Sequence, residues 1–187
     1  MAYLLYLSYW LRGYTGNNML RHFEKLLARF PYSTQTGGAA ALRISAVSSQ
    51  EPPVMERSFE EGAPVARILE LAREFAHGDC AYEVTAWWDL WEFDGVWKLR
   101  PCEVTLICFG PEFSRDEEEH LRIEFGIDSR FLPQPEHPNQ AVHVRSNIQG
   151  LLRLVHELDD AMPVDRRLLW TESGENFAER LQAALSR

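Results

Sequence analysis

The chain has 187 residues, of which 45% are hydrophobic and 25% are charged, so its composition excludes general disorder and predicts an ordinary folded protein. Its 28 acidic and 19 basic residues give a formal net charge of −9, which opposes nucleic acid and acidic membranes as partners because both are polyanions. Three cysteines cannot all pair, and we expect reduced thiols in a cytoplasmic protein.

The first segment is a hydrophobic run that resembles a leader peptide in composition. It has no early positive charge, and it ends at Arg12 after about ten residues, short of the roughly 20 that a membrane-spanning helix needs. Because the run is also rich in tyrosine and tryptophan without helical spacing, we predict a buried strand over residues 2–11.

A helix is predicted next, because apolar residues recur at every third or fourth position until Pro31 stops it. The stripe consists of Leu20, Phe23, Leu27 and Phe30. Two strands are then predicted over residues 39–47 and 54–59, separated by a turn that contains two prolines.

The second helix is predicted to start after Pro64 and to end at Gly78, with a wide apolar face between them. A long strand over residues 80–93 follows it. The order β-α-β-β-α-β is that of split βαβ, ferredoxin-like domains, so we predict an α+β fold that begins with this unit.

Asp94-Gly95 is the strongest hairpin signal in the chain, and it joins the strand at 80–93 to a second strand at 96–109. The hairpin crosses the midpoint of the sequence, so a domain boundary there would separate paired strands. We therefore predict one α+β domain over residues 1–187, or two fused half-domains, about 1–93 and 94–187, that share a sheet.

The register of this hairpin follows from the length of its turn. A two-residue loop places Asp89 opposite Arg100 and Trp91 opposite Lys98. Farther along, this register turns the apolar residues of the second strand to the wrong face, and one inserted residue restores them. Proline cannot donate to the ladder and favours bulges, so we expect an irregularity over residues 100–102, where a proline stands.

The second half is predicted to continue as β-α-β-α. Residues 110–119 read as a solvated acidic loop or short helix, and residues 121–127 alternate as a half-buried strand. The proline-rich residues 133–138 are the plausible flexible linker. Ser146 and Gln149 match a capping box ahead of an apolar stripe that reaches Leu158.

The last two elements are a short strand over residues 167–171 and an amphipathic helix with Phe177, Leu181 and Leu185 on one side. Ser173 stands at the strand-to-helix turn, where a nucleophile is also found in some hydrolases. We expect it to be the N-cap of the helix instead, because Glu175 then lies favourably in the first turn.

The tryptophan-rich hairpin is the candidate ligand surface. On its first strand Trp87, Asp89 and Trp91 share one side, and Lys98 and Arg100 lie across from them in the expected register. Indole faces can stack on a ring, a sugar or a cation, and a charged pair can orient it. The alternative is that helices cover this side and that the indoles belong to the core.

The sequence contains only weak indications of a metal or cofactor site. His77 and Cys80 have an H-x-x-C spacing, but no second closely spaced pair completes a four-ligand site. The chain also lacks the glycine-rich phosphate loops and the nucleophile motif of hydrolases. We therefore predict no metal and no cofactor, and the sequence assigns no catalytic residue.

Taken together, these patterns favour a non-enzymatic protein that binds a small molecule or a protein partner, as a homo-oligomer such as a homodimer. The alternative is an enzyme of unknown class, for example a hydrolase, with a carboxylate near the hairpin. A third possibility is neutralisation of a basic partner such as a toxin, which depends only on the charge of −9.

Overall fold

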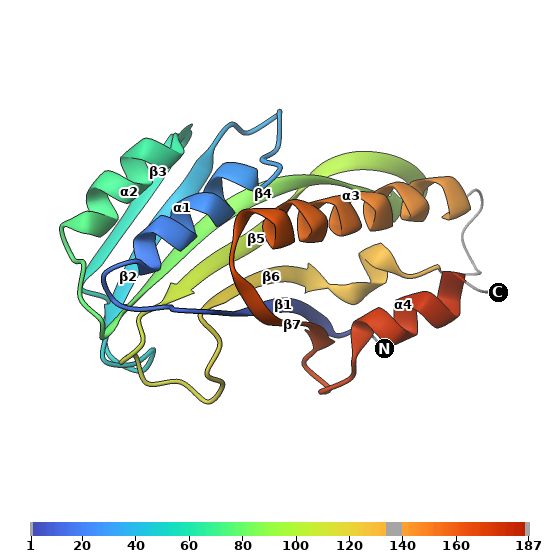
Figure 1. Ribbon diagram of the computed structural model, residues 1–187. Helices are drawn as coiled ribbons and strands as arrows, with labels where there is room; N and C mark the ends of the chain where they lie inside the picture. Colours follow the sequence, from blue (N-terminus) through green and yellow to red (C-terminus); the bar gives the residue numbers. More distant parts are fainter. Residues whose placement is uncertain (1, 134–139, 186–187) are drawn as a thin grey trace.

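The computed structural model describes residues 2–133 and 140–185. Its strands are β1 (Leu4–Leu11), β2 (Ala39–Ala46), β3 (Met55–Ala63), β4 (Cys80–Asp94), β5 (Val96–Phe109), β6 (Leu121–Ile127) and β7 (Val164–Thr171). They form one antiparallel sheet in the order β3-β2-β4-β5-β6-β1-β7, shown in Figure 1.

The helices are α1 (Met19–Arg29), α2 (Val65–Arg73), α3 (Gln140–Ala161) and α4 (Phe177–Leu185), with a short 3-10 turn at Asp128–Phe131. Figure 1 shows α1, α2 and α3 on one side of the sheet and α4 near β7. All four helices contribute buried side chains to the same core, for example Phe23, Ile68, Leu151 and Phe177. The apolar side of the sheet and the apolar stripes of the helices thus bury one another.

The α+β class is confirmed, and the first six elements follow the expected order along the chain. The ferredoxin-like arrangement is not confirmed, because β1 pairs with β6 and β7 and not with a strand of the first half. Chain order alone does not fix these pairings, since any strand with an apolar side can bury it at several places in a large sheet.

The β4–β5 hairpin has a tighter turn than expected. Asp94 lies opposite Val96 with only Gly95 between them, and the φ of +72° at Gly95 suits a residue without a Cβ. This turn supplies the one-residue offset that the sequence argument assigned to a bulge. The ladder runs without a shift from one end to the other, so the predicted irregularity over residues 100–102 is wrong.

Two predicted helix starts are also wrong. Because α3 begins at Gln140, Ser146 lies inside the helix and does not cap it. The last helix is capped by Asn176, whose Oδ1 accepts a hydrogen bond from the Ala178 N–H at 3.1 Å, and not by Ser173. The predicted linker at 133–138 lies, except for Pro133, outside the described residues.

The side of the sheet opposite the helices is called here the uncovered face. Its residues alternate with those of the core, so it carries mainly polar and charged side chains of β4, β5 and β6. At one end the chain between β5 and β6 folds over it, and Phe113 packs on Phe109 with ring centroids 5.9 Å apart. A second, small apolar cluster forms there, made of Ala81, Ile107, Phe109 and Phe113.

Candidate functional site

Asp89, the carboxylate of the predicted hairpin site, is fully engaged by the loop that follows α1. It accepts hydrogen bonds from the Ser33 hydroxyl at 2.5 Å, from the Thr34 N–H and hydroxyl at 3.1 and 3.2 Å, and from the Gln35 amide at 3.3 Å. Its register partner is Pro101 and not Arg100. The carboxylate therefore anchors a loop.

The other predicted site residues point to different surroundings. The Trp91 ring lies 4.3 Å from that of His143 on α3, whereas Trp87 is half-buried opposite Glu103. Lys98 is exposed, and Arg100 pairs with Asp94 of the hairpin tip at 3.1 Å. The structure does not gather the five side chains into one cluster, and ligand binding by them stays a prediction.

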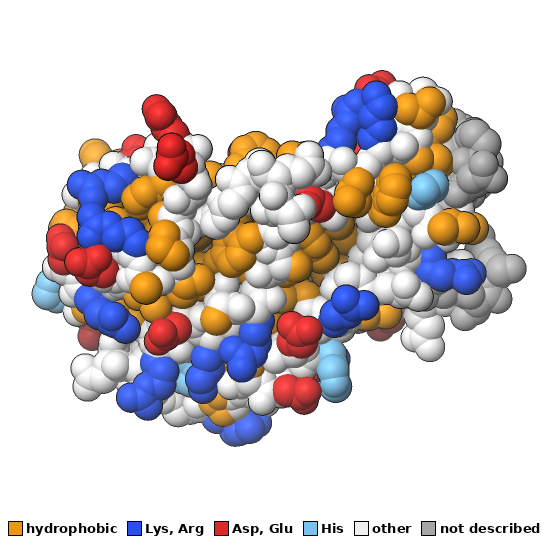
Figure 2. Space-filling model, turned by 90° about the horizontal axis from the view of Figure 1, so that it is seen from above, with side chains coloured by type: hydrophobic (Ala, Val, Ile, Leu, Met, Phe, Trp, Pro, Cys, Tyr) orange, Lys and Arg blue, Asp and Glu red, His pale blue; other side chains and the backbone are white. Residues whose placement is uncertain are grey.

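A hollow on the helix side lies between α3, β4 and the end of α1. It comprises two adjoining cavities of about 220 and 280 Å³, which share Trp88, Gly150 and Arg153. Figure 2 shows apolar side chains in the hollowed middle of this side and charged side chains mainly around its rim. The hollow touches Asp89 and Trp91, which are already hydrogen-bonded to the loop after α1 and to Asn147.

A different cleft, of about 380 Å³, lies on the uncovered face, and we call it the open-face cleft. Strands β4, β5 and β6 provide its floor, and two loops, residues 48–50 and 113–116, provide its walls. The floor residues are Glu83, Ile107, Phe109, Arg122 and Glu124. The cleft thus combines a ring-lined wall with charged groups from three neighbouring strands.

The two walls are joined to each other through Val47. Its carbonyl accepts a hydrogen bond from the Ser114 N–H, and its own N–H donates to the carbonyl of Asp79, both at 2.8 Å. Val47 has a φ of +71°, a left-handed conformation that costs a β-branched residue about 1–2 kcal/mol. Such strain is retained where the surrounding contacts hold it, and it is common beside functional sites.

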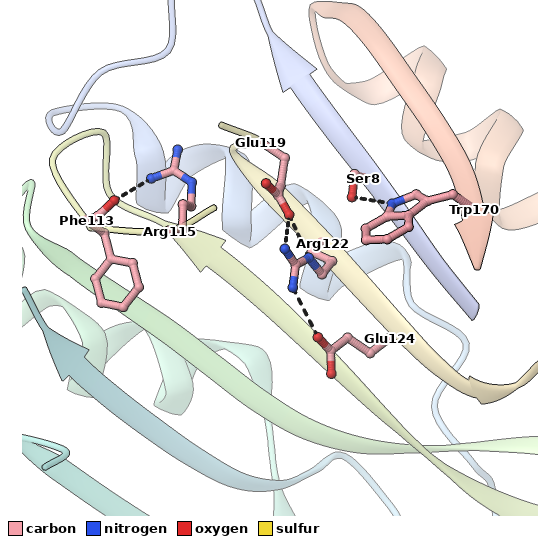
Figure 3. Close-up of polar contacts among 7 residues, drawn as sticks. All are labelled: Ser8, Phe113, Arg115, Glu119, Arg122, Glu124 and Trp170. Atoms are coloured by element: carbon pink, nitrogen blue, oxygen red, sulfur yellow. Dashed lines mark hydrogen bonds and ion pairs between the residues drawn. The ribbon is translucent and has the colours of Figure 1, made fainter. Parts of the chain in front are cut away.

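Arg122 connects the cleft floor to Glu119 of the loop between β5 and β6, as Figure 3 shows. Its Nε donates to Oε1 of Glu119 at 2.6 Å, its Nη2 donates to the same oxygen, and its Nη1 lies 3.5 Å from Oε1 of Glu124. The guanidinium also lies over the Phe109 ring, 5.3 Å from its centroid. Glu119 is completely buried, so the expectation of a solvated acidic run fails at this residue.

Arg115 holds the same loop, between β5 and β6, in shape. Its Nη1 donates to the carbonyls of Gly110 and Phe113, at 3.1 and 2.9 Å, and its guanidinium lies 5.1 Å from the Phe109 centroid. Figure 3 includes the contact with Phe113. Both arginines of the cleft therefore have protein acceptors, and their first role is to build its walls.

Glu83 is the exception among the charged groups of the floor. Its side chain is half-buried, and among the described residues it makes no hydrogen bond or ion pair. Burial raises the pKa of the Glu83 carboxyl above its ordinary value, and Arg43 on the neighbouring strand opposes that shift. An unpaired carboxyl with a raised pKa in a walled cleft is a candidate functional group.

The sequence carried a signal for part of this cleft. Glu83 stands between Tyr82 and Val84, which are both buried, so alternation assigns it to the uncovered face. Phe113 and Arg115 had no such signal, because the loop between β5 and β6 has no regular period.

In the described part of the chain, no three His, Cys, Asp or Glu side chains gather as metal ligands would, and no helix is long and apolar enough to cross a membrane. Comparison with protein-family models, with curated proteins and with solved structures finds no significant match to this chain.

Proposed function

We propose that the protein is a non-enzymatic binding protein that takes a small molecule in the open-face cleft. The observation that carries this proposal is the unpaired, half-buried carboxyl of Glu83 in a cleft of about 380 Å³. That volume lies in the usual range for small-molecule sites, which combine apolar walls with a few convergent polar groups.

Energetics support the same assignment. A partly buried carboxyl without a partner lowers stability, because the protein does not replace the hydrogen bonds that water would give it. The left-handed Val47 at the rim is a second local cost. Groups that reduce stability are retained where they serve a function, and two of them adjoin this cleft.

A panel of small polar metabolites, followed by the shift in melting temperature, tests the proposal. Wild type is compared with Ser49→Trp, which fills the cleft from an exposed position on its wall, and with Ser58→Trp, a matched change at an exposed serine on β3. We expect at least one compound to raise the melting temperature of wild type and Ser58→Trp but not of Ser49→Trp. If every stabilising compound acts equally on all three proteins, the cleft is not the site.

An enzyme that uses Glu83 as a general acid is the second candidate, and the raised pKa of this carboxyl favours it. Nuclear magnetic resonance of a bound compound during prolonged incubation separates the two readings. A binding protein leaves the compound unchanged, whereas an enzyme converts it and loses that activity in Glu83→Gln.

A homo-oligomer remains part of the proposal. β3 and β7 are the two edges of the sheet, and exposed edges can pair with another copy. Light scattering during size-exclusion chromatography gives the mass in solution. A multiple of the 21.6 kDa chain supports assembly, and a mass of one chain at all concentrations contradicts it.

A further inference from the structure

We infer that the open-face cleft selects an organic cation, an ammonium or guanidinium group on a short apolar body, with Glu83 as its counter-ion. This inference rests on the proposed function and adds the ligand class to it. It concerns the chemistry of the bound group, which a free amine and a basic side chain of a partner would share.

The charge of the ligand is inferred from which charged side chains of the cleft already have hydrogen-bond partners. All three nitrogens of Arg122 are directed to Glu119 or Glu124, and Arg115 donates to two backbone carbonyls. The Nε of Arg115 has no partner but is buried, so a ligand in the cleft does not reach it. Among the nitrogens of these two arginines that are not buried, only Nη2 of Arg115 has no acceptor, whereas the carboxyl of Glu83 has no partner among the described residues and can bind a cation.

The apolar lining fits the rest of such a ligand. Ile107, Phe109 and Phe113 are each at most 6% exposed, and they line the cleft together. Alkyl groups bury apolar surface against such side chains. The guanidinium groups of Arg115 and Arg122 already lie over the Phe109 ring, so the positive end of the ligand belongs at Glu83. A short alkyl chain that ends in a positive charge therefore matches the apolar wall and this carboxyl.

Several charged groups act on Glu83 from the strands around it. Arg43 of β2 and Arg122 of β6 stabilise its ionised form, whereas Glu56 of β3 and Glu124 of β6 oppose it. Arg43 is its register partner, yet the two side chains do not form an ion pair in the described residues. A bound cation would supply the close positive charge that Arg43 does not.

Three probes with the same four-carbon skeleton test the inference: n-butylammonium, n-butanol and n-butyrate. Titration is followed by the backbone amide signals of Ile107 and Ser114, which line the cleft. We expect saturable binding of butylammonium alone, weakened at least about tenfold in Glu83→Gln and unchanged in Glu60→Gln, an exposed carboxylate of β3 that is not among the charges acting on Glu83. Melting temperatures confirm that both variants fold.

The outcomes separate the two proposals. If butyrate or butanol binds and Ser49→Trp abolishes that binding, the cleft is a site but the cation assignment is wrong. If neither these probes nor the metabolite panel binds, both proposals are wrong. If butylammonium binds equally to wild type and Glu83→Gln, the counter-ion assignment is wrong.

The pH dependence adds a readout that a structural role of Glu83 would not move. A cation needs the ionised carboxyl, and burial raises the pKa of Glu83. We expect butylammonium to bind more tightly as the pH rises through that pKa, with no such trend in Glu83→Gln. A flat profile in wild type would contradict the assignment.

A capped lysine, N-acetyl-lysine methylamide, separates the two sources of the cation. If it binds at least as tightly as butylammonium, the cleft suits a basic side chain of a protein partner. If it binds at least about tenfold more weakly, the cleft suits a free amine.

Discussion

The two faces of the central hairpin differ although the same strands build them. On the helix side Val84 and Leu106 are register partners and are completely buried. On the uncovered face their chain neighbours, Thr85 and Thr105, face each other and remain partly exposed. Packing against helices thus accounts for one set of residues, and it does not account for the other.

This difference shows where stability and chemistry are located. The helix side buries many apolar side chains, and each contributes to stability by leaving water. The uncovered face keeps the unpaired Glu83 and borders the left-handed Val47, both of which lower stability. A binding site is expected to contain such destabilising features on one face, while the large core on the other face keeps the protein folded.

The largest expected effect on stability comes from replacing one of two adjacent residues that lie on opposite faces of the sheet. Leu106→Ala removes a completely buried side chain and should lower the free energy of unfolding by about 4 kcal/mol, because a cavity remains. Thr105→Ala, one residue earlier and on the uncovered face, should cost less than about 1 kcal/mol. Urea denaturation measures both. Equal losses would mean that the uncovered face is packed as tightly as the core.

A second test concerns the buried ion pair of the uncovered face. Arg122→Met leaves Glu119 buried without its partner and should cost about 3 kcal/mol at neutral pH. The double variant with Glu119→Gln removes the buried charge and should recover most of this loss. If the double variant is no more stable than the single one, the ion pair is not what holds this loop.

A third effect depends on pH and involves His120, at the start of β6. Burial lowers the pKa of His120 to about 4, below the ordinary value of 6.5. The unfolded chain therefore takes up a proton first as the pH falls, and stability is lost between about pH 6.5 and pH 4. Urea denaturation across this interval should show that loss in wild type and a smaller one in His120→Gln. Equal slopes in both proteins would contradict this origin.

The smallest expected effect is at the rim of the open-face cleft. Val47→Gly removes the steric conflict at φ +71° and should raise the free energy of unfolding by about 0.5 kcal/mol, after the greater flexibility of glycine is deducted. Val54→Gly, at an exposed valine without positive φ, should instead lower it. A gain at Val47 with weaker ligand binding would link the strain to function.

The local elements could be read from the sequence because their causes are local. The stripe from Leu20 to Phe30 predicted α1, and the strict alternation around Val84 predicted which side of β4 enters the core. The pairing of β1 with β6 and β7 could not be read, because it joins segments more than a hundred residues apart. Nothing within one segment encodes which distant edge it meets.

The candidate site was harder to predict than the fold. The tryptophan-rich composition predicted a ligand surface that included Asp89 and Trp91. In the folded chain a loop binds the Asp89 carboxylate, and Asn147 of α3 binds the backbone of Trp91. Glu83 was visible as an outward-facing residue, yet its isolation depends on where Arg43 and the acidic loop come to lie. Only the folded structure shows which charged side chains are already hydrogen-bonded within the protein and which can still bind a ligand.

The amide of Asn147 has a consequence for how this protein behaves among its own copies. β4 continues past the end of β2, so one edge of the hairpin arm would be open to any extended chain. The Asn147 side chain accepts from the N–H of Trp91 and donates to its carbonyl, both at 2.9 Å, as a neighbouring strand would. One side chain thereby occupies the two backbone groups of Trp91 that an added strand would need.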